Sequence, residues 1–255
     1  MTETLRQEAL QKAADLIRAS AFMVAFTGAG ISTPSGIPDF RSAHTGLWEK
    51  DDPFEVASLT AFHRHPERFF NWLRPLARDL YQAAPNPAHL GLAQLEKAGL
   101  LKAIITQNID GLHQKAGARN VIEVHGSMTR LDCLNCRRSY STAEYADSFI
   151  IQGSIPRCSR CGNILKPSIT LFEEMLPQKA WDQAERACRK ADLVLVVGSS
   201  LEVVPAAYLP MHALDNHARL IINNLTRTPL DQRADALLPW DTAEAIPALV
   251  EKLQI

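Results

Sequence analysis

The sequence has no long apolar run and no excess of charge of either sign. Its longest apolar stretches, such as LVLVVG from Leu193, are too short to cross a bilayer. The formal net charge of −1 gives no overall field that would attract nucleic acid or an anionic membrane. The first twenty residues contain neither an apolar signal-peptide segment nor a small-residue cleavage site. We therefore expect a cytoplasmic protein with no membrane or specific nucleic-acid partner.

Internal repeats, low-complexity tracts and long linkers are also missing. The 255 residues suit one large domain or a domain with an inserted lobe. Six short apolar runs alternate with helical stretches, at residues 22–27, 101–106, 121–124, 192–198, 219–223 and 235–239. This alternation predicts an α/β fold with a doubly wound, Rossmann-like parallel sheet that has helices on both faces.

Two segments do not fit this alternation. Residues 45–84 are helical and rich in aromatics, and residues 127–172 hold four of the five cysteines. We expect these segments to form a smaller inserted lobe with a helical module and a cysteine module. Residues 1–44, 85–126 and 173–255 would form the Rossmann-like domain.

Cysteine is scarce, but four of the five cysteines form two pairs, Cys133-x-x-Cys136 and Cys158-x-x-Cys161. In a cytosolic chain such pairs indicate a metal site rather than disulfides. Four thiolates suit a tetrahedral zinc ion and leave no open coordination position, so the pairs predict one structural zinc. A nucleic-acid-binding ribbon is the alternative, but the only stacking aromatic near its arginines is Tyr140.

Polar clusters follow five of the predicted strands. They are GAG at 28–30, QNID at 107–110, HG at 125–126, GSS at 198–200 and NN at 223–224. In open α/β sheets, ligands bind in the crevice outside the carboxyl ends of the strands. We therefore expect all five clusters to line one crevice.

The first cluster lacks the third glycine of a dinucleotide-binding turn, because Thr33 stands in that place and Pro34 follows it. Proline disfavours helix in the residue before it, so no ordinary phosphate-binding helix is expected directly after this turn. This departure disfavours a dehydrogenase. The two glycines alone could also mark a simple tight turn.

Three local patterns allow a functional and a structural interpretation. His125 ends an apolar strand and could be a general base near neutral pH, or a structural histidine. Asn108 and Asp110 could orient a carboxamide, or form an Asx turn. Residues 165–177 read as an extended strand between prolines, which could accept a peptide by strand addition or simply return the chain to the sheet.

Taken in order, these motifs resemble the sirtuin family of NAD-dependent protein deacylases, most of all its bacterial and archaeal deacetylase branch. The shared set is GAGIS with SGIPDFR, TQNIDGLH, HG, the two cysteine pairs, KP with LFEEMLP, VVGSSLEVVPA and NNLTRTPLD, across residues 20–240. The resemblance implies an NAD-binding Rossmann-like domain and removal of acetyl and longer apolar acyl groups from lysine in proteins. The products would be nicotinamide, O-acetyl-ADP-ribose and free lysine. Mono-ADP-ribosyl transfer to protein is the alternative that the same NAD site allows.

The resemblance also implies roles for particular residues. His125, as general base, and Asn108 would be catalytic. Substrate would contact Ile169, Leu171, Phe172, Val203 and Val204, and zinc would be bound by Cys133, Cys136, Cys158 and Cys161. NAD would contact Gly28, Ala29, Gly30, Thr33, Asp39, Phe40, Arg41, Gln107, Asn108, Ile109, Asp110, Gly198, Ser199, Ser200, Asn224, Leu225 and Asp241.

The chain departs from the family pattern at two places and lacks one feature of the branch that removes succinyl groups. Glu173 stands where the family usually has glycine in the peptide-binding segment, and Arg227 stands where many relatives carry an acidic residue. The branch that removes succinyl groups carries a Tyr-x-x-Arg pair on a small-lobe helix, and residues 67–82 contain no such pair. We therefore expect an apolar acyl site lined by Phe69, Phe70, Trp72 and Leu73.

Overall fold

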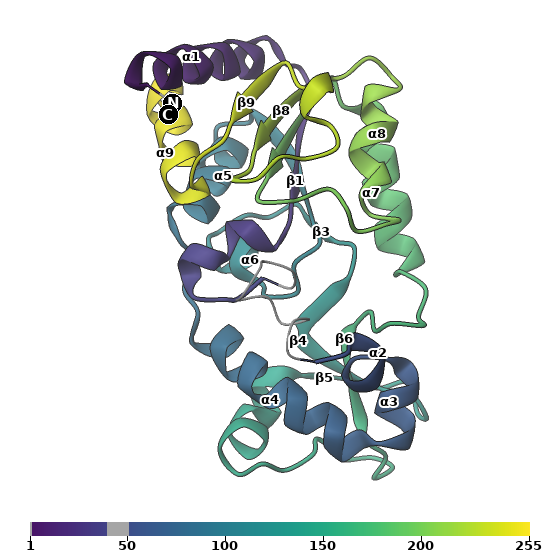
Figure 1. Ribbon diagram of the computed structural model, residues 1–255. Coiled ribbons are helices and arrows are strands. Elements are labelled where there is room, and N and C mark those ends of the chain that lie inside the picture. Colours follow the sequence, from purple (N-terminus) through teal and green to yellow (C-terminus); the bar gives the residue numbers. More distant parts are fainter. Residues whose placement is uncertain (1, 40–50) are drawn as a thin grey trace.

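A computed structural model describes residues 2–39 and 51–255 of the chain. Its larger sheet has six strands, all parallel, in the order β3-β2-β1-β7-β8-β9 (Figure 1). The strands are β1 (Met23–Thr27), β2 (Leu101–Thr106), β3 (Val121–Glu123), β7 (Leu193–Val197), β8 (Arg219–Asn223) and β9 (Ala236–Leu238). Each lies within one residue, at either end, of an apolar run singled out in the sequence.

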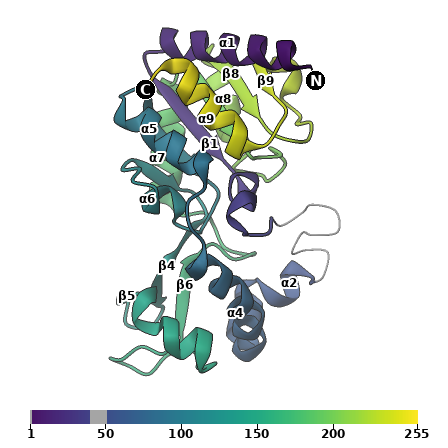
Figure 2. The same cartoon turned by 90° about the vertical axis from the view of Figure 1, so that its left-hand side faces the viewer.

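Helices cover both faces of this sheet, as the alternation of elements predicted (Figures 1 and 2). One face carries α1 (Glu3–Ala19), α5 (Pro87–Lys97) and α9 (Thr242–Leu253), and the other carries α7 (Gln178–Lys190) and α8 (Tyr208–Leu214). Successive strand residues point to opposite faces. Thus Ala25 packs into the core on the first face, while Val24 and Phe26 pack into the core on the second. The doubly wound α/β fold is confirmed.

The ends of the elements follow local chemistry. Helix α5 begins at Pro87, where a missing N–H costs nothing, and Asn86 and His89 form a capping box there. Beyond its end at Lys97, Gly99 takes the left-handed conformation, with φ of 76°. After β1, two short 3₁₀ helices, η1 (Ala29–Ile31) and η2 (Thr33–Ser35), replace the long helix of an ordinary dinucleotide-binding turn.

A second, antiparallel sheet has the strand order β5-β4-β6 and lies at the opposite end of the molecule from α1 (Figures 1 and 2). Its strands are β4 (Gly126–Cys133), β5 (Ser139–Ser141) and β6 (Leu165–Ile169). Pro167 is tolerated inside β6 because this edge strand pairs only with β4. The extended strand expected over 165–177 is shorter than predicted: it ends at Ile169, and a turn closed by the Glu174 N–H and the Leu171 carbonyl follows it.

Three helices pack beside this sheet: α2 (Pro53–Val56), α3 (Leu59–Arg64) and α4 (Pro66–Gln82). Phe69 and Phe70 of α4 are buried, and their rings meet edge to face at 5.0 Å between centroids. They share an apolar cluster with Met128 of β4 and with Phe149. No helix among the described residues is long and apolar enough to cross a membrane.

Candidate active site

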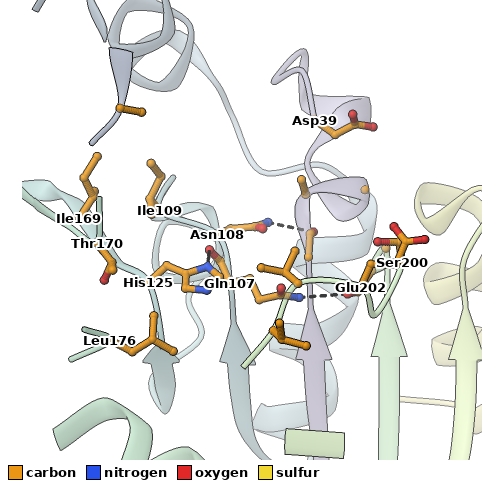
Figure 3. A pocket seen from close by; sticks show the side chains of 18 of the residues that line it. Asp39, Gln107, Asn108, Ile109, His125, Ile169, Thr170, Leu176, Ser200 and Glu202 are labelled. Atoms are coloured by element: carbon orange, nitrogen blue, oxygen red, sulfur yellow. Dashed lines mark hydrogen bonds between the residues drawn. The ribbon is translucent and has the colours of Figure 1, made fainter. Parts of the chain in front are cut away.

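All five polar clusters meet in one cavity of about 1170 Å³ at the carboxyl ends of the parallel strands. Side chains from the loops after β1, β2, β3 and β7 converge there (Figure 3). The turn after β6 and the small-lobe helix α4 complete the wall. The crevice expected from the sequence is therefore present, and it lies between the two sheets.

Glycines in two loops allow the backbones at the floor of this cavity to touch. The Gly30 N–H donates to the Gly198 carbonyl at 2.8 Å. A Cβ on Gly30 would lie 2.9 Å from Gly198 Cα, and a Cβ on Gly198, where φ is 61°, would lie 2.2 Å from the Ile31 nitrogen. Both positions require glycine, because any side chain would force the loops after β1 and β7 apart.

The Asn108 side chain is fixed from behind. Its amide nitrogen donates to the Gly28 carbonyl and to Ser32 Oγ, at 3.1 Å each. Ser32 Oγ in turn donates to Asp110 at 2.7 Å. Asp110 is buried and does not line the cavity, and its other oxygen accepts the Leu112 N–H at 2.8 Å. Asp110 thus forms the Asx turn that the sequence allowed, and it orients Asn108 through Ser32.

Two buried histidines, His89 and His113, extend this network. The Asn86 N–H donates to His89 Nδ1 at 3.4 Å, which places the His89 proton on Nε2, facing Ser32 Oγ at 3.4 Å. Burial lowers the pKa of His89 to about 4 and that of His113 to about 3. Both side chains are therefore neutral near pH 7. The sequence did not reveal them, because each occurs singly in a helical stretch.

His125 lies on the cavity wall with a defined tautomer. Its Nδ1 is 3.0 Å from the Gln107 carbonyl oxygen, which can only accept a hydrogen bond (Figure 3). Nδ1 therefore carries the proton, and Nε2 is the basic nitrogen. That carbonyl belongs to the Gln107 backbone, and the side-chain amide of Gln107 donates to Ser199 Oγ at 3.0 Å. This geometry suits a general base.

The opposite wall is mostly apolar. Trp72, Leu73 and Leu76 of α4 line it. Of the four residues expected to line the acyl site, Trp72 and Leu73 do so. The other two, Phe69 and Phe70, are buried behind the wall, and that part of the expectation is wrong. The guanidinium of Arg74 points elsewhere: it donates to the carbonyls of Phe149 and Gly153 at 3.0 and 2.8 Å. No cation of α4 lines the cavity.

The four paired cysteines converge in the small lobe. Their sulfur atoms all lie within 4.8 Å of one another, and those of Cys133 and Cys161, like those of Cys136 and Cys158, are 3.5 Å apart. Four sulfurs at about 2.3 Å from a tetrahedral zinc would be about 3.8 Å apart, so the cluster fits that ion. A hydrogen bond from the Tyr140 hydroxyl at 3.0 Å lowers the pKa of the Cys158 thiol to about 6.

Most residues expected to contact NAD or substrate line the cavity. Asp110 lies behind it, and Phe40 and Arg41 lie outside the described residues. The sequence had not singled out several other lining residues, among them Thr170, Glu174, Met175, Leu176, Gln178, Trp181, Glu202, Thr226 and Thr242. For residues 170–178, the sequence signal was the stretch between Pro167 and Pro177. It indicated an extended segment but not the turn that brings these residues to the cavity.

The chain belongs to the Sir2 family, the sirtuins, whose family model matches residues 28–205. It is 45% identical over 249 residues to the NAD-dependent protein deacylase 2 of Archaeoglobus fulgidus, with 97% of each chain covered. It is also 45% identical over 243 residues to an NAD-dependent protein deacetylase of Sulfurisphaera tokodaii, with 95% of each covered. A solved structure of Sir2 with a p53 peptide and NAD⁺ superposes with a TM-score of 0.86 at 38% identity, covering 95% of this chain and 98% of that one.

Proposed function

We propose that this protein is an NAD-dependent protein lysine deacetylase that transfers the acetyl group to ADP-ribose. The observation that carries the proposal is the presence, in one cavity, of His125 fixed as a base and of Asn108 fixed by Gly28 and Ser32 of the loop after β1. The relatives compared above, named deacylase or deacetylase, support it. They favour it over mono-ADP-ribosyl transfer, the alternative open from the sequence.

The residues present fit NAD. The loops at 28–30 and 198–200 bring bare backbone to the cavity floor, which suits close approach of a pyrophosphate. The amides of Gln107 and Asn108 suit the ribose and carboxamide of the nicotinamide half, with Ile109 and Asp39 beside them. Asn224, Leu225 and Asp241, with Ser199 and Ser200, would hold the adenosine half. Asp110 would act through Ser32 rather than by contact.

Bound NAD would supply the ribose carbon that receives the acyl oxygen when nicotinamide leaves. The residues of this chain would orient the two substrates and move one proton. His125 Nε2 would accept a proton from a ribose hydroxyl, and the Gln107 carbonyl would stabilise the imidazolium through Nδ1–H. Apolar side chains that line the cavity would bind the acyl-lysine and exclude water, namely Ile169, Leu171, Phe172, Val203 and Val204.

We propose that Cys133, Cys136, Cys158 and Cys161 hold one structural zinc ion. Because all four ligands are protein thiolates, the ion would have no open position for substrate. Its role would be to hold together the end of the small lobe, where the short strand β5 and the two cysteine knuckles have little apolar core of their own.

Two further proposals concern organisation and location. The division into a Rossmann-like domain (1–44, 85–126 and 173–255) and a small lobe (45–84 and 127–172) is supported by the separate hydrogen-bonding of the two sheets. Four paired cysteines that form no disulfide suit a reducing compartment, which supports our proposal that the protein is cytoplasmic.

The test is mass spectrometry of an acetyl-lysine peptide incubated with NAD and the protein. Loss of the acetyl group should be matched, mole for mole, by nicotinamide and O-acetyl-ADP-ribose. The unmodified peptide and a carrier protein serve as the second arm. ADP-ribosylated carrier without deacetylation would instead establish the transferase, and no NAD consumption with either would refute both enzymes.

A further inference from the structure

Glu173 occupies a backbone conformation that favours glycine. It follows Phe172 in the turn closed by the Glu174 N–H donating to the Leu171 carbonyl at 3.1 Å. Glu173 is the third residue of this turn and has φ of 73°, as glycine has in a type II turn. Something outside the backbone must therefore favour glutamate at this position.

The Glu173 side chain reaches out of the turn to the small-lobe helix α3. Its carboxylate accepts the N–H of Thr60, in the first turn of that helix, at 2.9 Å. Hydrogen bonds from the Thr60 side chain and backbone lower the pKa of Glu173, so the group is an anion near pH 7. The carboxylate thereby satisfies a helix N–H that has no partner within α3.

Two backbone hydrogen bonds lie beside this contact. The Phe172 N–H donates to the Ala57 carbonyl, and the Leu59 N–H donates to the Phe172 carbonyl, at 3.0 Å each. The Phe172 ring also packs on Phe54 of α2, with centroids 5.0 Å apart. The turn is thus fastened along one edge to the helical module, beside β6 (Figure 1).

The neighbouring Glu174 performs a different task. Its carboxylate accepts the Leu171 N–H at 2.9 Å and pairs with Lys166 Nζ at 2.8 Å. Lys166 is buried in β6 and also donates to the Ile169 carbonyl at 2.7 Å. The shape of the turn is therefore set by Glu174 and Lys166, and Glu173 is left to fix the turn against α3.

The other edge of the turn is open. Within the part of the chain that the structure describes, neither the N–H nor the carbonyl of Glu173 makes a hydrogen bond, and the residue lines the cavity. An extended peptide could pair with this edge by strand addition. The residue with the open backbone is also the one whose side chain is anchored away from the cavity.

We propose that Glu173 is a positioning residue for the substrate peptide, anchoring the peptide-binding turn to α3 through Thr60. The anchor joins the turn to the helical module, whose Trp72 and Leu73 line the same cavity. Peptide and acyl group would then be bound by parts held in fixed relation. This inference rests on the proposed deacetylase function and adds a determinant of peptide affinity to it.

Three substitutions at this one position test the inference in the full-length protein, with an acetyl-lysine peptide and NAD. Glu173→Gln keeps an oxygen acceptor for Thr60, and we expect KM for the peptide within about twofold of wild type. Glu173→Ala and Glu173→Gly remove the acceptor, and we expect the peptide KM to rise about 3- to 10-fold, as for the loss of one ordinary, solvent-exposed hydrogen bond. KM for NAD and kcat at saturating peptide should stay within about twofold.

Thermal stability separates positioning from a merely structural role. Glycine relieves the left-handed backbone and alanine does not, so Glu173→Gly should melt above Glu173→Ala while the two share the same raised peptide KM. Glu67→Ala, on the exposed side of the same module, is the matched control and should leave both KM values and kcat unchanged.

Two results would overturn the inference alone: a wild-type peptide KM for Glu173→Gly, or a Glu173→Gln as impaired as Glu173→Gly, which would mean that the charge acts on the peptide directly. A wild-type protein that neither binds the peptide in fluorescence anisotropy nor deacetylates it would overturn the proposed function, and the inference with it.

Discussion

At the residue scale, His125 derives its proposed role from its neighbour rather than from its own type. The chain has eight histidines, and two others, His89 and His113, are more deeply buried. Among the histidines of residues 2–39 and 51–255, only His125 combines a place on the cavity wall with a carbonyl on Nδ1 that leaves Nε2 basic. His89 and His113 belong to the network behind Asn108, where neutrality matters more than basicity.

Replacing His125 with alanine should abolish deacetylation while NAD binding survives. Loss of a general base costs roughly 100- to 10,000-fold in rate, whereas the loops at 28–30 and 198–200, which would hold the pyrophosphate, are held together by their own backbone contacts. Turnover is measured by nicotinamide release and NAD affinity by calorimetry. Near-normal deacetylation by His125→Ala would remove this residue from the mechanism.

The buried pair His89 and His113 predicts a loss of stability toward acid. Unfolded histidine has a pKa of about 6.5. In the folded protein the pKa of His89 is about 4 and that of His113 about 3. Below about pH 6.5 these two histidines therefore bind protons in the unfolded chain but stay neutral in the folded protein. Because the unfolded state binds more protons, the free energy of unfolding should fall by about 2 kcal/mol per histidine between pH 7 and 5.

Urea titrations at the two pH values measure this fall. His113→Gln, which can keep a hydrogen bond to Thr27 in place of the imidazole, should remove about half of it. The exposed His63→Gln is the control and should leave the fall unchanged. If His113→Gln kept the full pH dependence, the buried imidazole would not be its source.

At the element scale, the sequence predicted what depends on periodic burial. The four central strands, β1, β2, β7 and β8, are apolar runs buried on both faces, and the boundaries of β2 and β8 could be predicted to the residue. The turn after β6 could not, because its path depends on Lys166, Glu174 and Thr60, which are far apart in sequence or look like ordinary surface charges. The candidate site divides in the same way: the loops after strands were foreseen, and the network of His89 and His113 behind Asn108 was not.

The cysteine module should depend on its metal. Strand β5 spans only three residues, and the apolar cluster beside it centres on Leu131 and Leu165 together with the cysteines themselves. Cys133→Ser should therefore release zinc and unfold or loosen the small lobe rather than only slow the chemistry. Structural zinc contributes about 10–16 kcal/mol of apparent binding free energy, comparable with the whole stability of a domain.

Zinc content by atomic absorption and melting by calorimetry test this expectation. Cys188→Ser is the matched control, because this fifth cysteine lies on the buried face of α7 and is not part of the cluster. It should retain one zinc per chain. A zinc-free Cys133→Ser with the melting temperature of the wild type would contradict a structural role for the metal.

At the scale of the whole molecule, the cavity lies between the two sheets, and residues from both sides form its walls. The Rossmann-like side supplies polar loops, and the small-lobe side supplies α4 with Trp72, Leu73 and Leu76. The polar half suits the nucleotide and the apolar half suits an acyl chain. We therefore expect the small lobe to determine which acyl group is accepted and the loops of the larger sheet to determine which cofactor is bound.

Acetyl-lysine and longer apolar acyl-lysines should be removed well and succinyl-lysine poorly. A succinyl carboxylate would be buried against α4 without a cation, because Arg74 is held by the Phe149 and Gly153 carbonyls and its guanidinium stacks on Phe149 at 5.2 Å. Burying an unpaired charge costs several kcal/mol, and each 1.36 kcal/mol is about tenfold in rate. We expect kcat/KM to be at least about 100-fold lower for succinyl than for acetyl peptide at saturating NAD. A pentanoyl-lysine peptide, similar in length but uncharged, separates charge from size: it should be turned over far better than the succinyl peptide, and equal values for acetyl and succinyl peptides would show that a cation reaches the acyl chain after all.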